Sequence, residues 1–191
     1  MVILDISEKM LEIAESKASQ LSIQDRVDIL VGDMEKIEMP DASFDVVLCH
    51  LALCHVNEPS RALTEFSRLL RKDGLFSLIV ENKLFYAISR AFQGDLSEAL
   101  RRLRENRLTV TVPGLGRLRT FERNELLTLL ERVGLKPVKV LGLRIFSDYL
   151  LYAHKAPPQD LESLREVEAL LSRSTDYSSI GRFHFIICQK T

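Results

Sequence analysis

Three polar residues follow apolar runs that are typical of buried strands, and each has a side chain suited to binding. These residues are Asp5, Asp33 and His50, and they follow the runs 2–4, 27–31 and 44–49. Ligands of open parallel sheets bind outside the carboxyl ends of the strands. A carboxylate at the first position can accept both hydrogen bonds of a ribose diol, and one at the second can face an adenine amino group. The pattern favours a nucleoside site. The alternatives are that Asp5 helps to cap a helix and that Asp33 starts a turn.

Helices alternate with these predicted strands. Ser7 is a good N-cap, and apolar residues follow it at helical spacing. A second helix is indicated by the apolar face of residues 62–70, and the run 75–80 predicts another strand. Continuous apolar strands are typical of sheets covered on both faces. The expected fold class is therefore α/β with a doubly wound, mostly parallel sheet, in a single domain over residues 1–191.

The alternation breaks after Glu81 and resumes near Glu122. Residues 82–120 contain no clear buried strand and are rich in arginine, so we expect an insertion over the active-site end of the sheet. Beyond it, the pattern predicts a helix over 122–133, a strand over 138–145, a helix after a polar break at 156–158, and a last strand over 182–188.

Four segments within residues 1–81 resemble motifs of class I S-adenosylmethionine-dependent methyltransferases. They read Val-Ile-Leu-Asp, Val-Gly-Asp-Met, Phe-Asp-Val-Val-Leu-Cys-His and Leu-Leu-Arg-Lys-Asp-Gly-Leu. The resemblance implies that S-adenosylmethionine is the cofactor. It places Asp5 on the ribose, Asp33 and Met34 beside the adenine, and His50 near the methionine moiety.

That family also has a strand and a glycine-rich loop ahead of the first of these motifs, where backbone N–H groups receive the cofactor. Neither precedes Val2. We therefore expect the sequence to be a fragment or a late-starting gene model, N-terminally incomplete for this fold, and to bind its cofactor weakly by itself.

Two later segments resemble the bacterial tRNA 5-carboxymethoxyuridine methyltransferases, which methylate the carboxylate of a modified wobble uridine. These segments are 142–150 and 180–183, and residues 82–84 and 94–95 fall in comparable places. The family has a histidine where this chain has Phe185. His184 is one position away and would point to the other face of a strand, so no role is carried to it.

A carboxylate acceptor needs alignment and no strong general base, because a carboxyl with a pKa near 4 is already ionised at neutral pH. Arg144, with Tyr149 or Arg182, is the candidate catalytic set that would hold it, since arginine binds carboxylates in a bidentate manner. The alternatives are a structural ion pair between Arg144 and Asp148, and a Tyr149 packed in the core.

The stretch from Arg90 to Arg123 holds eight arginines and four acidic residues, although the whole chain has a net charge of -1. Arg101, Arg102 and Arg104 are the candidates for contact with tRNA phosphates. The alternative is a solvated helix face whose leucines pack inward. Those leucines are Leu96, Leu100 and Leu103.

The three cysteines have neither disulfide nor zinc-ligand spacing, and no apolar stretch is long enough to cross a membrane. We expect reduced thiols, no metal, no membrane association and a cytoplasmic location. Three function classes stay open: a methyltransferase acting on tRNA, a methyltransferase acting on a small molecule, and a non-catalytic remnant or interaction module.

Overall fold

The computed structural model describes residues 1–106, 108–114, 116–152, 161–174 and 176–191. The predicted polar break at 156–158 lies outside them. The strands are β1 (Val2–Asp5), β2 (Asp28–Val31), β3 (Phe44–His50), β4 (Leu70–Glu81), β5 (Thr109–Val112), β6 (Gly116–Arg119), β7 (Leu135–Leu143) and β8 (Phe183–Lys190). The helices are α1 (Glu8–Gln20), α2 (Pro59–Leu69), α3 (Lys83–Phe92), α4 (Leu96–Arg104), α5 (Arg123–Arg132), α6 (Ser147–Tyr152) and α7 (Leu161–Ser172), with short 3₁₀ turns η1 (Gln24–Arg26), η2 (Leu53–His55) and η3 (Ser178–Ile180).

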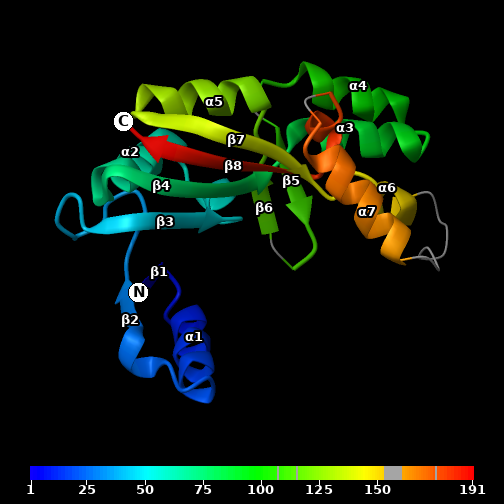
Figure 1. The fold of residues 1–191 in the computed structure, drawn as a ribbon. Helices are drawn as coiled ribbons and strands as arrows, with labels where there is room; N and C mark the ends of the chain where they lie inside the picture. Colours follow the sequence, from blue (N-terminus) through cyan, green and yellow to red (C-terminus); the bar gives the residue numbers. More distant parts are fainter. Residues whose placement is uncertain (107, 115, 153–160, 175) are drawn as a thin grey trace.

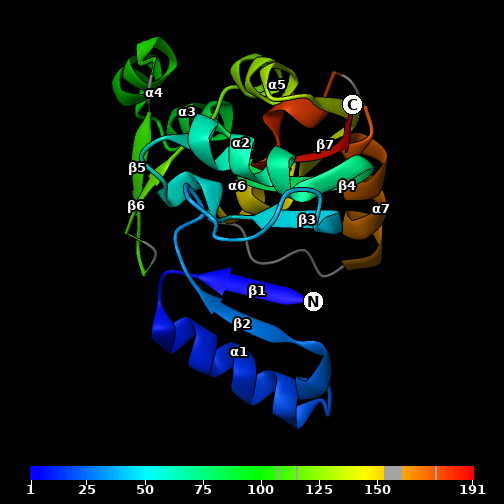
Figure 2. The same ribbon diagram turned by 90° about the vertical axis from the view of Figure 1, so that its left-hand side faces the viewer.

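The first strand, helix and second strand form a separate unit below the rest of the chain (Figures 1 and 2). β1 and β2 pair in parallel, with Val2 opposite Asp28 and Asp5 opposite Val31. Ser7 is the N-cap of α1, and its side chain accepts a hydrogen bond from the Met10 backbone N–H. The predicted order of strand, helix and strand is confirmed.

The remaining long strands form one four-stranded sheet in the order β3-β4-β8-β7. β3 and β4 are parallel, whereas β8 runs antiparallel to both of its neighbours. The α/β class is confirmed: in this mixed sheet β3, β4 and β7 run in the same direction, and β8 runs in the opposite one. The reason is positional: β8 starts beside the end of β7, with Phe183 opposite Leu143, so it must run the other way. Apolar runs indicate burial and carry no information on strand direction.

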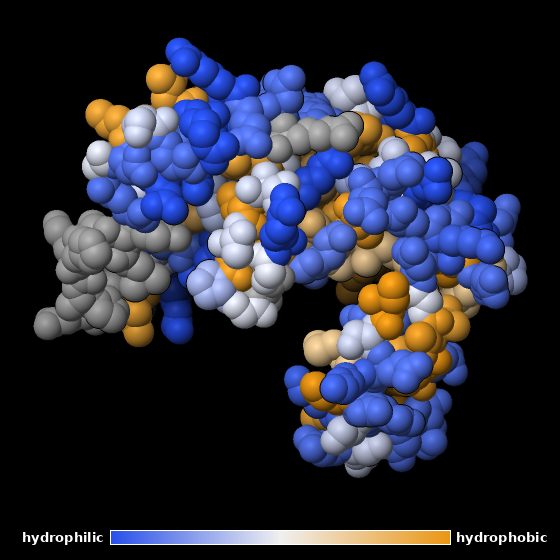
Figure 3. Space-filling model, turned by 180° about the vertical axis from the view of Figure 1, so that it is seen from behind, coloured by the Kyte–Doolittle hydropathy of each residue, from blue (hydrophilic) through white to orange (hydrophobic). Residues whose placement is uncertain are grey.

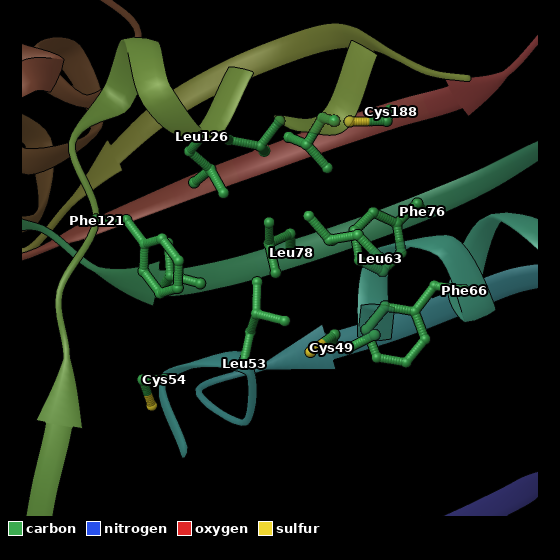
Figure 4. Close-up of a cluster of buried hydrophobic side chains, with 14 of the residues drawn as sticks. Cys49, Leu53, Cys54, Leu63, Phe66, Phe76, Leu78, Phe121, Leu126 and Cys188 are labelled. Carbon is green, nitrogen blue, oxygen red and sulfur yellow. The ribbon is translucent and has the colours of Figure 1, made fainter. Parts of the chain in front are cut away.

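The hydrophobic core lies between the four-stranded sheet and the helices α2 and α5 (Figure 4). Phe76 and Leu78 of β4 meet Leu63 of α2 and Leu126 of α5, and none of these side chains is exposed. Burying an aliphatic or aromatic side chain of this size stabilises a fold by about 1.5–3 kcal/mol. The helical spacing over residues 62–70 therefore predicted the face of α2 that carries the core, although the helix ends at Leu69 and Leu70 begins β4.

The segment 82–120 contains the helix pair α3 and α4 and the hairpin β5-β6. Val110 and Leu118 of the hairpin are buried, so the expectation that this segment holds no buried strand is wrong. The strands are only four residues long, and the alternation Thr-Val-Thr-Val is the signal that marks the first of them. That the segment is an insertion stays a prediction.

The leucines of α4 do not pack inward. Leu96, Leu100 and Leu103 are 68%, 46% and 51% exposed, and the buried residue of this helix is Ala99. The alternative of a solvated helix face is therefore wrong in its prediction that these leucines pack inward.

The turn after β7 is held by a carboxylate from α7. Glu168 accepts hydrogen bonds from the backbone N–H groups of Ile145, Phe146 and Ser147, at 2.7, 2.8 and 2.8 Å. These N–H groups lead into α6, whose first turn has no intrahelical acceptors for them. Arg144, directly before them, has a positive φ of 55°. Glu168 therefore fixes the backbone that carries Arg144.

Candidate active site

Both predicted ligand carboxylates lie in local turns at the strand ends. Asp5 Oδ1 accepts a hydrogen bond from the Ser7 backbone N–H at 2.8 Å. Asp33 Oδ1 accepts one from the Glu35 backbone N–H, also at 2.8 Å. The Asp33 contact is the turn that the alternative interpretation predicted, and the Asp5 contact holds Ser7, the N-cap residue of α1, as the alternative of helix capping predicted. Neither Oδ2 atom has a hydrogen bond with the described residues, so each carboxylate keeps an acceptor oxygen for a ligand.

A cavity of about 580 Å³ separates β1 from β3. Within the described residues, β1 pairs only with β2 and β3 only with β4, so each strand keeps one unpaired edge. Val46 and Leu48 of β3 are 52% and 66% exposed there. Figure 3 shows the hollow between the N-terminal unit and the rest of the chain, bordered by hydrophobic residues. The space between these two edges is therefore apolar and open to a further chain segment.

Two predicted cofactor residues, Met34 and His50, line this cavity together with Leu4. His50 Nε2 lies 2.8 Å from Ser77 Oγ, and the imidazole ring meets the Phe185 ring edge-on with 6.1 Å between centroids. These contacts fix the ring at the end of β3. Asp5 and Asp33 are not among the lining residues, although each is the sequence neighbour of one.

The residues around this cavity fit the nucleoside half of S-adenosylmethionine. The walls are mainly apolar and include the thioethers of Met34 and Met39, which suit a flat base. The Oδ2 atoms of Asp5 and Asp33 leave acceptors at the adjoining strand ends. The described lining residues include no lysine or arginine for the methionine carboxylate. The amino-acid half of the cofactor therefore needs donors that these walls do not supply.

A second group of polar side chains lies at the carboxyl end of β4. Glu81 is 2% exposed and accepts a hydrogen bond from the Tyr86 hydroxyl at 2.9 Å. Arg182 lies between two carboxylates, 3.6 Å from Glu81 and 3.4 Å from Asp148. Burial raises the pKa of Glu81, and the positive charge of Arg182 opposes that rise. The cluster is a buried ionic network, and the charge of Glu81 also helps to raise the pKa of the Cys54 thiol in η2.

The three predicted catalytic residues lie around this network. Arg144 forms an ion pair with Asp148, and its side chain is 47% exposed. Arg182 reaches the same Asp148. The Tyr149 hydroxyl donates a hydrogen bond to the Ile180 carbonyl oxygen at 2.8 Å, and its ring packs against Phe85. Arg144 and Arg182 are thus brought together by Asp148, whereas the contacts of Tyr149 are those of a packed core residue.

Acidic neighbours already pair with most of the predicted RNA-binding arginines. Arg101 forms ion pairs with Glu98 and Glu105. Arg102 is bound to Glu98 and donates to the Tyr86 carbonyl oxygen. Arg104 has no ion pair with the described residues. The positive charge available to a phosphate on α4 is smaller than the count of arginines suggests.

Sequence reasoning missed Glu81 and Tyr86 as members of this site. The signal for Glu81 was present, because it is the first polar residue after the apolar run 75–80, just as Asp5 follows the run 2–4. Nothing in the local sequence marks Tyr86, which reaches Glu81 from the first turns of α3.

The three cysteines contribute little to the chemistry of the site. All three cysteines are free and buried. Burial raises the pKa of Cys49 to about 12, of Cys54 to about 11 and of Cys188 to about 12, so the thiols stay protonated. Among the described residues, we find no group of three potential ligands that could hold a metal ion and no helix that could span a membrane.

Known proteins similar to this chain include several methyltransferases. Residues 1–78 match a family model described as "Methyltransferase domain". An uncharacterized methyltransferase of Bacillus subtilis is 33% identical over 75 residues, which are 39% of this chain and 29% of that protein. A demethylmenaquinone methyltransferase of Lactobacillus johnsonii is 30% identical over 76 residues, covering 40% of this chain and 31% of its own length. The chain thus spans less than a third of these curated relatives.

Solved structures extend the likeness to the whole chain. A methyltransferase structure from Thermotoga maritima, described as a possible histamine N-methyltransferase, superposes with a TM-score of 0.62 at 21% identity, covering 98% of this chain and 72% of that one. An S-adenosylmethionine-dependent methyltransferase structure from Listeria monocytogenes gives a TM-score of 0.61 at 19% identity, with 100% and 79% coverage. The chain therefore has the fold of the class I S-adenosylmethionine-dependent methyltransferases, and its residues 1–78 are similar in sequence to a methyltransferase domain.

Proposed function

We propose that this chain takes part in the transfer of a methyl group from S-adenosylmethionine to an acceptor. The observation that carries the proposal is the position of Met34 and His50 on one cavity at the strand ends, within the segment that matches the methyltransferase domain. S-adenosylmethionine is the cofactor that the family match indicates. When bound, it supplies an electrophilic methyl group on a sulfonium sulfur. The protein's task is then to orient the cofactor and the acceptor.

In this proposal, the cofactor's parts are held by different strand ends. The free oxygen of Asp5 accepts hydrogen bonds from ribose hydroxyls, since that carboxylate follows β1 and keeps its Oδ2 available. Asp33 and Met34, which follow β2, border the adenine. His50 borders the methionine part, with its ring fixed by Ser77 and Phe185.

Replacing Asp5 by alanine is expected to weaken cofactor binding by about 1–3 kcal/mol, the scale of lost charge-assisted hydrogen bonds. Asp5→Asn separates this effect from folding, because its amide oxygen can still accept from the Ser7 backbone N–H. Asp28→Ala, at the amino end of β2, is the matched control. Binding is measured by NMR titration with S-adenosylmethionine, in the chain as it stands and with a strand, turn and helix added ahead of Met1. Unchanged affinity in both Asp5 variants would remove Asp5 from the site.

For the acceptor, we propose the carboxylate of a modified tRNA wobble uridine, as the later sequence segments suggest. Its support is the half-exposed Arg144, whose guanidinium lies beside Asp148 and in one network with Arg182. An acceptor carboxylate would have to share these arginines with Asp148. Arg104, with no ion pair to the described residues, is the best placed of the α4 arginines for phosphate contact.

A small organic acceptor is the second candidate. Two observations favour it: Arg101 and Arg102 are neutralised by Glu98 and Glu105, and similar proteins include methyltransferases named for demethylmenaquinone and for 27-O-demethylrifamycin SV. A cytoplasmic location stays a prediction for either acceptor, as does the alternative of a non-catalytic interaction module.

Arg144→Lys is expected to lower methyl transfer about tenfold or more while leaving cofactor affinity nearly intact, because an ammonium cannot replace a bidentate guanidinium. The assay compares tRNA carrying a carboxymethoxy wobble uridine with the same tRNA lacking the carboxylate. Arg132→Lys, on the exposed end of α5, is the control. Equal methylation of both RNAs, or full activity of Arg144→Lys, would reject the carboxylate acceptor and leave a methyltransferase whose acceptor is not assigned.

A further inference from the structure

A second cavity, of about 360 Å³, lies where the first turns of α3 and α5 approach the start of β8. Its walls include Lys83, Arg123, Ser179 and His184. No residue lines both this cavity and the one between β1 and β3. The second cavity therefore does not belong to the candidate cofactor site.

His184 is the most unusual part of its wall. The side chain is 1% exposed, and neither Nδ1 nor Nε2 has a hydrogen-bonding partner among the described residues. A buried polar group without a partner is costly and calls for an explanation. Burial lowers the pKa of His184 to about 3, and the charge of Arg123 adds to this effect. A contact of the ring with the Phe121 backbone, too poor in geometry to count as a hydrogen bond, opposes it. The ring is therefore neutral near pH 7, with one nitrogen to donate and one to accept.

Arg123 also has a buried nitrogen without a hydrogen-bonding partner among the described residues. Its Nε atom is buried without a hydrogen-bonding partner, and Nη2 donates only to Ser178 Oγ, at 3.0 Å. No described carboxylate forms an ion pair with it. Burial lowers the pKa of this guanidinium. A half-buried arginine is ordinarily paired with an anion. The guanidinium of Arg123 therefore brings to the cavity a positive charge that has no anionic partner among the described residues.

The N-terminus of α5 adds a partial positive charge to the cavity. Glu122 stands at its N-cap position and makes no side-chain cap, so the first N–H groups of this ten-residue helix have no such acceptor. The start of α3 differs, because the Asn82 side chain accepts from the Leu84 backbone N–H. Glu122 is the single carboxylate among the described lining residues, and it is exposed.

We propose that this cavity binds a small oxyanion, the carboxylate or phosphate group of a ligand, between Arg123 and the first turn of α5. Arg123 Nε and one His184 ring N–H donate to the anion, and Lys83 adds positive charge from the start of α3. The bound anion satisfies the donors that the protein leaves unpaired. This site is independent of the proposed methyl transfer, and it is tested without cofactor or acceptor.

The test follows the His184 ring signals by NMR while inorganic phosphate, and separately acetate, is added at constant ionic strength set with chloride. The signals are assigned by their loss in His184→Gln. We expect a saturable shift with at least one of the two anions and none with chloride alone, and the stronger response identifies the preferred ligand group. Arg123→Gln is expected to weaken binding about tenfold or more, because it removes a charge-assisted hydrogen bond.

Arg132→Gln, at the other end of the same helix, is the matched control and should bind as the parent does. Lys83→Gln, at a half-buried lining position at the start of α3, provides a second variant if Arg123→Gln loses its fold. A His184 response to phosphate and acetate no larger than that to chloride would overturn the proposal. So would undiminished binding in folded Arg123→Gln and Lys83→Gln.

Discussion

Replacing Gly142 by alanine is expected to destabilise the protein by about 3 kcal/mol or more. A Cβ at this position of β7 would lie 2.8 Å from the Ser178 carbonyl carbon and would also overlap its carbonyl oxygen. Both atoms belong to the backbone of η3, which cannot move aside as the end of a flexible side chain can. The midpoint of urea unfolding measures the effect.

Gly32→Ala is the matched control for this change. Its added Cβ would lie 3.5 Å from the nearest atom, the Cδ1 of Leu4, which is ordinary van der Waals contact. We expect its unfolding midpoint to stay close to that of the parent. A Gly142→Ala protein that unfolds at the parent's urea concentration would show that η3 does not need this close approach to β7.

Adding a strand, a glycine-rich turn and a helix ahead of Met1 is expected to raise affinity for S-adenosylmethionine at least about a hundredfold. The physical reason is that β1 and β3 each keep an edge that no described strand pairs with, and these two edges border an apolar cavity of about 580 Å³. A strand between them would pair with both, and the helix is needed because parallel strands require a crossover. The turn would bring backbone N–H donors to the cofactor, and a few such hydrogen bonds account for a hundredfold gain.

Isothermal titration calorimetry measures this gain, and thermal unfolding measures the added burial of apolar surface. The control carries the same segment with the strand's inward apolar residues changed to lysine, which the cavity cannot accommodate. Equal cofactor affinity with and without the added segment would mean that the cavity between β1 and β3 is not where the glycine-rich turn acts.

The alternation of strand and helix was predictable in the first half of the chain, because the strands there are largely apolar runs followed by a polar residue. Asp5 and His50 mark such ends, and both lie at strand ends in the structure. Strand direction was not predictable, because burial alone does not distinguish the antiparallel β8 from a parallel strand.

The candidate site was predictable only in part. Met34 and His50 line one cavity, whereas the partners of Arg144 and Tyr149 depend on contacts between distant segments. Tyr149, for example, donates to the Ile180 carbonyl oxygen, and no local pattern links these two positions. His184 was assigned no role, and its burial beside Arg123 became visible only in the folded chain.

The position of β8 also has a consequence for the order of events during synthesis. β4 and β7 are neighbours in the sheet only through β8, which consists of Phe183–Lys190. Domains fold as the chain emerges from the ribosome, with N-terminal parts first. This sheet cannot close until its last strand is free, and Lys190 then donates to the Leu70 carbonyl oxygen at 2.7 Å. Until residues 183–190 have emerged from the ribosome, the edges of β4 and β7 that pair with β8 stay unpaired.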